Sequence, residues 1–160
     1  MLIEFSVTNF RSIRETQTLS MVSSKHYKDF EDTNCFDSKL RGFPKLLRAG
    51  AIYGPNAAGK SNLLRAIHFM RRFILTSHSH QEGQPIDDVE PFALSTDTRS
   101  EPSEFEISFI KDDVRFQYGF AVNQTRVIKE YLLANHKGKE QRWYERSYDP
   151  RTNKDDYKFG

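Results

Sequence analysis

The stretch AIYGPNAAGKSNLLRAI, residues 51–67, sets two glycines, a lysine and a serine between an apolar run and an amphipathic run. Within it, residues 54–61 match the eight-position pattern G-x-x-x-x-G-K-[ST] of a phosphate-binding loop. Such a loop holds phosphate because consecutive backbone N–H groups form a concave nest for an anion. The pattern therefore predicts a phosphate cradle between a strand and a helix, in an α/β fold.

Each position of the loop has a predicted role. Gly54 and Gly59 allow backbone angles and close approach that a Cβ would obstruct. Lys60 is expected to reach the β- and γ-phosphates as a mobile charge, and the Ser61 hydroxyl to coordinate Mg²⁺, which prefers oxygen ligands. The helix that follows adds its unpaired N–H groups and dipole. The predicted cradle consists of Gly54, Pro55, Asn56, Ala57, Ala58, Gly59, Lys60 and Ser61.

The flanks of the loop have the patterns that such a cradle requires. The apolar run LLRAGAIY, residues 46–53, predicts a buried parallel strand that ends at the loop. From residue 61 the apolar side chains fall at helical spacing, which predicts an amphipathic helix ending near residues 75–77. Its expected buried stripe consists of Leu63, Ile67, Met70 and Ile74.

The remaining sequence predicts strands. Residues 2–10 alternate in polarity, as a half-buried strand does, and a second strand is expected to end near Val22. Residues 23–44 are polar and aperiodic, which is typical of a long surface loop. Period-two alternation from Phe105 to Val122 predicts a β-hairpin, with two further strands after it. We expect an antiparallel β-meander over about residues 104–148 and a polar turn after it.

Composition limits the class of protein. The 13 Phe and 7 Tyr suffice for a core, and the net charge of +2 argues against a dedicated polyanion binder. The one cysteine, Cys35, allows no internal disulfide and fits a reducing compartment. The N-terminus is not a signal peptide, and no apolar run approaches the roughly 18 residues of a membrane span. These observations predict a cytoplasmic protein.

The variable loop residues suggest a relationship. GPNAAGKSNLL resembles the Walker A of ABC-type ATPases in the SMC, RecF and OLD-nuclease branch, and IEFSVTNFRSI resembles their first strand. The sequence is most similar to a bacterial group of AAA-annotated ATP-binding proteins, which often occur in phage-defence and abortive-infection loci. The resemblance implies a P-loop NTPase, the N-terminal lobe of an ABC-ATPase-like head with an antiparallel β-subdomain, that binds ATP and Mg²⁺. It also implies that Asn62 lies beside the triphosphate and that Arg11 lies near it.

Binding a nucleotide does not suffice for hydrolysis, which needs an acid to orient water and a second Mg²⁺ ligand. The nearest candidates, Asp112 and Asp113, follow an alternating half-exposed strand, so we interpret them as a turn and not as a Walker B. The sequence also has no LSGGQ-type signature. We expect residues 1–160 to be the N-terminal portion of one head in a longer ATPase and to be inactive alone.

Several alternatives remain open. The ATPase is expected to dimerise through its heads and to gate an effector or nuclease in anti-phage defence. It is alternatively a RecF- or SMC-like DNA-repair or chromosome-maintenance ATPase, or a nucleotide sensor that scaffolds a toxin or nuclease without hydrolysis. A basic helical stretch, Arg65 to Arg72, is compatible with DNA contact, although a solvated helix face explains it as well. His78 and His80 are interpreted as a solvated loop and not as a metal site.

Overall fold

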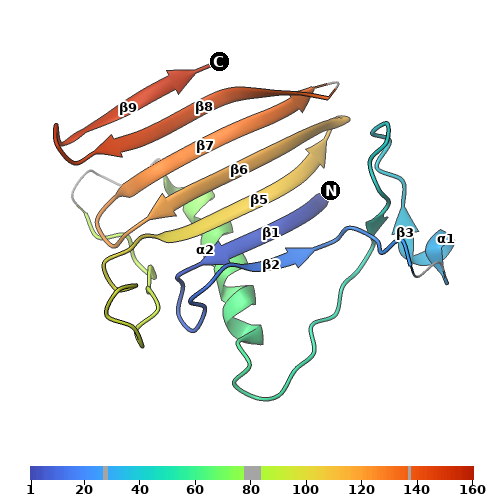
Figure 1. The fold of residues 1–160 in the computed structure, drawn as a ribbon, viewed down its shortest axis with the longest axis horizontal. Coiled ribbons are helices and arrows are strands. Elements are labelled where there is room, and N and C mark those ends of the chain that lie inside the picture. Colours follow the sequence, from blue (N-terminus) through green and yellow to red (C-terminus); the bar gives the residue numbers. More distant parts are fainter. Residues whose placement is uncertain (27–28, 78–83, 137) are drawn as a thin grey trace.

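A computed structural model describes residues 1–26, 29–77, 84–136 and 138–160. Its main element is a seven-stranded sheet in the order β2-β1-β5-β6-β7-β8-β9, in which every neighbouring pair is antiparallel (Figure 1). The strands are β1 (Leu2–Thr8), β2 (Gln17–Ser20), β5 (Ser103–Lys111), β6 (Val114–Val122), β7 (Val127–His136), β8 (Lys139–Asp149) and β9 (Lys154–Phe159). A short helix α1 (Glu31–Asn34) and the two-stranded pair β3 (Cys35–Phe36) and β4 (Leu46–Leu47) lie beside this sheet.

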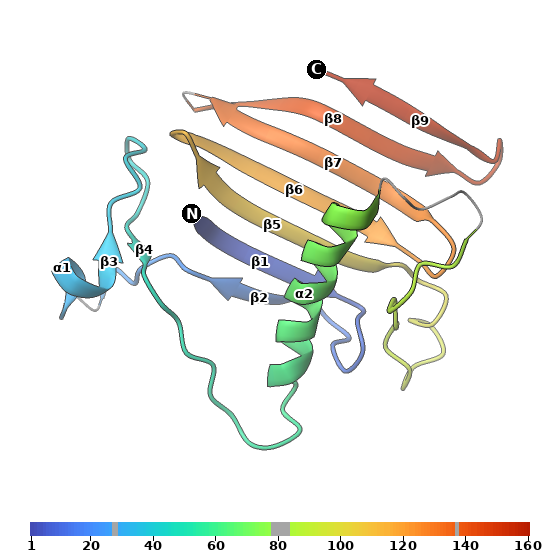
Figure 2. The ribbon, with the colours of Figure 1, turned by 180° about the vertical axis from the view of Figure 1, so that it is seen from behind.

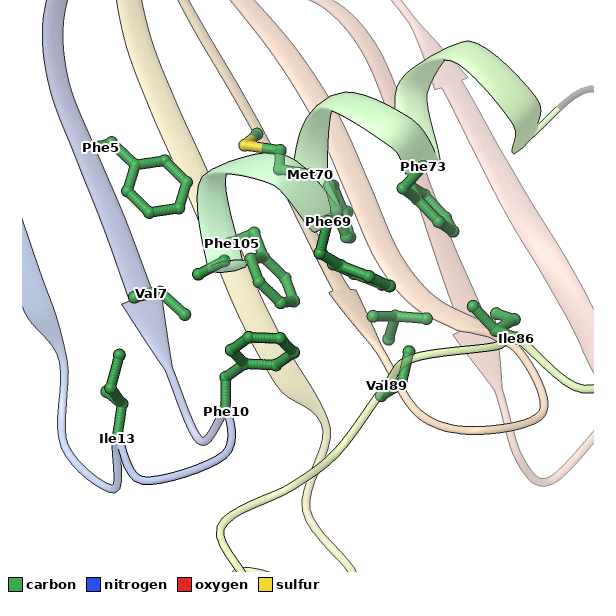
Figure 3. Close-up of a cluster of buried hydrophobic side chains, with 13 residues drawn as sticks. Phe5, Val7, Phe10, Ile13, Phe69, Met70, Phe73, Ile86, Val89 and Phe105 are labelled. Carbon is green, nitrogen blue, oxygen red and sulfur yellow. The ribbon is translucent and has the colours of Figure 1, made fainter. Parts of the chain in front are cut away.

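The long helix α2 (Lys60–Thr76) crosses one face of the sheet over β1, β5 and β6, while β8 and β9 extend beyond it (Figure 2). Its buried residues are Ala66, Phe69, Met70 and Phe73. Phe69 packs on Phe105 of β5 at 4.9 Å between ring centroids (Figure 3). Phe73 stacks on Phe120 of β6 at 4.4 Å between ring centroids. This phenylalanine cluster joins α2 to the sheet.

The predicted helix is confirmed, but its predicted apolar stripe is wrong in part. Ile74 is 46% exposed, whereas the unpredicted Phe69 and Phe73 are buried. The core face of the helix runs through residues 66, 69, 70 and 73, so the stripe is rotated from its expected position. Aromatic side chains of β5 and β6 lie on the face of the sheet that α2 covers, and the aromatic residues of α2 pack against them.

The strand predictions are confirmed for β1, β2 and the meander from β5 to β8. Ile3, Phe5 and Val7 are the buried set of β1, as the alternation indicates. The expected polar turn after residue 148 is confirmed for residues 150–153 but wrong beyond them, because residues 154–159 form β9 and pair with β8. The expected loop 23–44 also contains α1 and β3. Short polar strands such as β9 are hard to predict because their partner, not their own alternation, stabilises them.

The buried parallel strand expected over residues 46–53 is wrong. In this segment only Leu46 and Leu47 form a strand, and they pair antiparallel with β3. Ile52 is 38% exposed and Tyr53 is 89% exposed, in an open segment that leaves the sheet before α2 begins (Figure 2). A parallel strand needs parallel neighbours, and the described strands pair only antiparallel. The described part of the fold is therefore an antiparallel sheet with one long helix, not an α/β unit built on a parallel sheet.

Candidate functional site

The loop of residues 54–61 leads directly into α2, and Gly59 is the residue that makes this junction. Gly59 is the N-cap of the helix and has a left-handed φ of 86°, without a side-chain cap. A left-handed backbone costs an ordinary L-residue roughly 1–2 kcal/mol, which explains glycine at this position. Ala57 also has a left-handed φ, 65°, so the loop is strained at a non-glycine residue.

The start of α2 has no side-chain cap, so its first backbone N–H groups are available to bind an anion. The first N–H groups of a helix have no intrahelical partners, and no side chain of Gly59 covers them here. Lys60 Nζ folds back over the loop and donates hydrogen bonds to the carbonyl oxygens of Gly54 and Pro55, each at 2.7 Å. The ammonium group therefore lies over the loop, which leads into the helix start with its unpaired N–H groups. These residues fit a bound phosphate group.

A pocket of about 620 Å³ lies between this loop and the turn that joins β1 to β2. This is within the size range of small-molecule and cofactor sites, which is about 300–1,000 Å³. The loop and helix line one wall, and the β1–β2 turn lines the other. The lining residues are Ser12, Ile13, Arg14, Glu15, Gln17, Ile52, Tyr53, Ala57, Ala58, Gly59, Lys60 and Leu63.

Six of the eight predicted loop residues are exposed, namely Gly54, Pro55, Asn56, Ala57, Ala58 and Ser61, the last in the first turn of α2. The Ser61 hydroxyl is therefore accessible as an oxygen ligand for a hard cation. Among the described residues, no group of three or more His, Cys, Asp or Glu side chains is placed to hold a metal ion. His78 and His80 lie outside the described residues.

Asn62 lies in the first turn of α2, beside the β1–β2 turn. Its Nδ2 donates to Ser12 Oγ at 2.6 Å, and its Oδ1 accepts from Arg65 Nη1 at 3.1 Å. Ser12 also lies against the N-cap, since a Cβ on Gly59 would be 3.5 Å from its Oγ. Sequence reasoning missed Ser12, because nothing in the sequence indicates that residues 12 and 62 meet.

Arg11 points away from the loop pocket. Its Nη2 forms an ion pair with Glu90 Oε1 at 2.7 Å, and its guanidinium lies over the Phe10 ring. Arg11 lines a separate pocket of about 310 Å³ with residues of α2, among them Arg65 and His68. The geometry thus brings Asn62 to the loop, whereas Arg11 faces the segment around Glu90. A contact between Arg11 and a nucleotide stays a prediction.

The basic stretch of α2 is exposed, since Arg65, His68, Arg71 and Arg72 all face the surface. Arg72 is already engaged, because it pairs with the Asp88 carboxylate and donates to the Asp87 carbonyl at 3.3 Å. Contact between this face and DNA stays a prediction.

The expectation that Asp112 and Asp113 form a turn is confirmed. Both have left-handed φ angles, 51° and 59°, between β5 and β6. They are on a hairpin tip and not at the end of a parallel strand, so they do not have the position of a Walker B acid. The Cys35 side chain is buried.

The comparison with protein families agrees with the loop geometry. A family model described as "AAA domain, putative AbiEii toxin, Type IV TA system" matches residues 51–159, more than half of the chain. No curated protein matches the chain. In the described ranges, no helix is both long and apolar enough to cross a bilayer. The helix-capping Gly59 and the Lys60 that follows it agree with this match. The chain therefore belongs to the family of AbiEii-type AAA domains, which are AAA-type ATPase domains of the P-loop NTPase class.

Proposed function

We propose that this chain binds Mg-ATP through residues 54–61 and contributes that loop to an ATPase of the ABC/SMC/RecF-like branch. The observation that carries the proposal is the uncapped, left-handed Gly59 at the start of α2, with the Lys60 ammonium beside it and a pocket of about 620 Å³ in front. The N–H groups of residues 59–61 and Lys60 would hold the β- and γ-phosphates. Ser61 would supply a protein oxygen to Mg²⁺, and phosphate and water would supply the others.

The proposal assigns the hydrolytic step to groups beyond the loop. Asp112 and Asp113, the nearest acids to a Walker B position by sequence, lie on the β5–β6 hairpin tip. We propose that the water-orienting acid and the signature come from further sequence or from a partner head, so that residues 1–160 act as the N-terminal portion of one head. A homodimer with nucleotide between two heads provides this arrangement.

The proposed biological context is bacterial defence against phage, in which ATP occupancy gates a toxin or nuclease effector. The family description, which names a toxin of a type IV toxin–antitoxin system, favours this context. A nucleotide-sensing scaffold without turnover is the alternative within the same context. Single-turnover assays distinguish the two, because a sensor forms no ADP.

A DNA-linked ATPase of the RecF or SMC type is the second candidate. The exposed basic residues of α2 favour it, since Arg65 and Arg71 present guanidinium groups on one helix. Neutralising phosphates with these groups would give an affinity for duplex DNA that falls with rising salt. Equal DNA binding by the wild type and the Arg65→Ala/Arg71→Ala double variant would contradict a role for this face.

Calorimetric titration of Mg-ATP into the wild type and Lys60→Ala tests the main proposal. We expect the variant to lose measurable binding while its circular dichroism and melting temperature stay unchanged, because the Lys60 ammonium bonds to the loop carbonyls of Gly54 and Pro55 and Lys60 is not in the core. Lys111→Ala, which removes an exposed lysine at the end of β5, is the matched control and should bind normally. Equal affinity for ATP in the wild type and Lys60→Ala would refute the proposed site.

Turnover by residues 1–160 alone should not exceed the background rate. ATP hydrolysis that the Lys60→Ala change abolishes would show that a catalytic acid lies within these residues, and the proposed division of the site would then be wrong.

A further inference from the structure

The hydrogen bond between Asn62 Nδ2 and Ser12 Oγ, 2.6 Å long, joins the first turn of α2 to the β1–β2 turn, which lines one wall of the loop pocket. Among the described residues, it is the one side-chain hydrogen bond that connects the first turn of α2 with the β1–β2 turn. We propose that Ser12 is a positioning residue of the nucleotide site, whose hydroxyl holds Asn62 and so fixes the phosphate-binding start of α2. This inference rests on the proposed function of that site.

The β1–β2 turn is rigid enough to position another element. Phe10 and Ile13 exchange two backbone hydrogen bonds of 2.8 Å, which leaves Arg11 and Ser12 as the two corner residues. Arg11 has a left-handed φ of 54°, a conformation that costs an L-residue energy unless its surroundings hold it. Its backbone N–H donates to the Glu90 carbonyl at 2.7 Å, and its side chain pairs with the Glu90 carboxylate. These contacts fix the place of the Ser12 hydroxyl.

The start of α2 needs such an anchor. Gly59 contributes no capping side chain, and residues 51–58 are all exposed, so the chain before the helix has little packing. Asn62 has two fixed contacts, because Ser12 holds its Nδ2 and Arg65 holds its Oδ1. The Asn62 backbone N–H meanwhile donates to the Gly59 carbonyl at 2.9 Å. Holding the Asn62 side chain therefore restrains the turn whose N–H groups face the ligand.

Such a restraint improves binding by preorganisation, since an ordered first turn loses less conformational entropy when phosphate binds. Ser12 touches neither phosphate nor Mg²⁺ in this role; it acts through Asn62. Removing its hydroxyl should weaken Mg-ATP binding by about 3- to 10-fold, which corresponds to the net value of one hydrogen bond. The unliganded fold should change little, because the core contains neither residue.

A double-mutant cycle on the Mg-ATP dissociation constant tests the inference. The variants are Ser12→Ala, Asn62→Ala and the double variant, each titrated by calorimetry alongside the wild type. We expect the double variant to bind no more weakly than Asn62→Ala, because either change breaks the same bond. Ser12→Thr keeps the hydroxyl and should restore most of the affinity, which a purely steric role of Ser12 would not explain. Ser100→Ala, which removes an exposed hydroxyl bonded to the Asp97 carbonyl, is the control and should bind normally.

The outcomes separate this inference from the proposed function. Wild-type affinity in Ser12→Ala, or losses that simply add in the double variant, would overturn the role of Ser12 while the loop remains a nucleotide site. If Ser12→Ala does not fold, the Ser12→Thr variant decides the question. A Ser12→Thr variant that binds Mg-ATP clearly more weakly than the wild type would then overturn the role of Ser12. An absence of Mg-ATP binding by the wild type would refute both.

Discussion

Asn9 and Thr98 lie 89 residues apart in sequence, yet Asn9 Nδ2 donates to the Thr98 carbonyl at 2.8 Å in the interior. The same Nδ2 lies within hydrogen-bond distance of the carbonyls of Glu101 and Pro102, and the Asn9 Oδ1 accepts from the Phe92 N–H at 2.9 Å. Asn9 thus holds the segment before β5 against the end of β1. Because it adjoins the β1–β2 turn, it also stabilises one wall of the loop pocket.

Asn9→Ala should destabilise the fold by about 2–5 kcal/mol, because each buried polar group left unpaired costs about 1–3 kcal/mol. Asn9 also has a left-handed φ of 52°, which Asn tolerates better than Ala. Urea unfolding of Asn9→Gly separates the loss of hydrogen bonds from the backbone strain, because glycine accepts that φ but forms none of the side-chain hydrogen bonds of Asn9. A loss below about 0.5 kcal/mol in both variants would show that the network contributes nothing measurable.

Gly59→Ala should weaken Mg-ATP binding as well as stability. The φ of 86° strains any residue with a Cβ by roughly 1–2 kcal/mol, and the strain falls on the phosphate cradle itself. Gly138→Ala is the matched control, since Gly138 has a φ of 81° with nothing within 4 Å of the added Cβ. Both variants should lose similar stability on thermal melting, and only Gly59→Ala should lose ATP affinity. Equal affinities in the two variants would contradict a special role for the cradle.

Phe69→Ala should cost about 3–5 kcal/mol of unfolding free energy, the usual range for a buried Phe. Phe69 is 4% exposed and contacts rings from β5, β6 and the β1–β2 turn, so its loss leaves a cavity between α2 and the sheet. Leu64→Ala on the same helix is the control, because Leu64 is 60% exposed and should change stability by less than about 0.5 kcal/mol. Denaturant titration of both variants measures the difference, and similar losses would show that the helix packs by another face.

Gly119→Ala should destabilise the sheet through a cross-strand clash. An added Cβ would lie 2.6 Å from the ring of Tyr131, which covers Gly119 and donates its hydroxyl to the Glu106 carboxylate. Either the ring or β6 must shift, and overpacking of this kind costs about 1–3 kcal/mol. Gly50→Ala, where the new Cβ meets only an ordinary contact with Met21, should be close to neutral in the same melting experiment. A neutral Gly119→Ala would mean that Tyr131 is free to move aside.

Stability should fall at alkaline pH because of a tyrosine–carboxylate cluster. Glu130 accepts hydrogen bonds from Tyr118 at 2.7 Å and from Tyr144 at 3.2 Å. Burial and, next, the charge of Glu130 raise the pKa of Tyr144 from 10.0 to about 12, and the same causes raise the pKa of Tyr118 even further. The unfolded chain loses these protons first, so stability is complete below about pH 10 and decreases as the pH rises towards 12.

Glu130→Gln tests this cluster. The change removes the negative charge, so the pKa of Tyr144 should fall but stay above its ordinary value, because burial is the larger cause. Phenolate absorbance titrations of the wild type and the variant measure the shift. Glu145→Gln, a neighbouring carboxylate paired with Arg142, should leave the titration unchanged. Identical titrations of the wild type and Glu130→Gln would contradict the assignment.

Local patterns predicted the elements that local interactions stabilise. The helix after the loop and the hairpin from residue 105 have strong periodicity, and both are present as α2 and as β5 with β6. The segment before the loop was predicted wrongly, because apolar residues such as Ile52 and Tyr53 indicate burial but not the partner that would bury them. In the described structure no parallel neighbour pairs with that segment, so Ile52 and Tyr53 remain exposed.

The sequence by itself determined the phosphate-binding pattern of residues 54–61 and the amphipathic helix behind it, since both depend on residues close together in the chain. Only the tertiary structure decided that Ser12 meets Asn62, that Asn9 holds the Thr98 segment, and that Arg11 pairs with Glu90. These pairs are separated by 50 to 89 residues. Their meeting depends on which strands pair and where turns place them, and no local periodicity encodes that information.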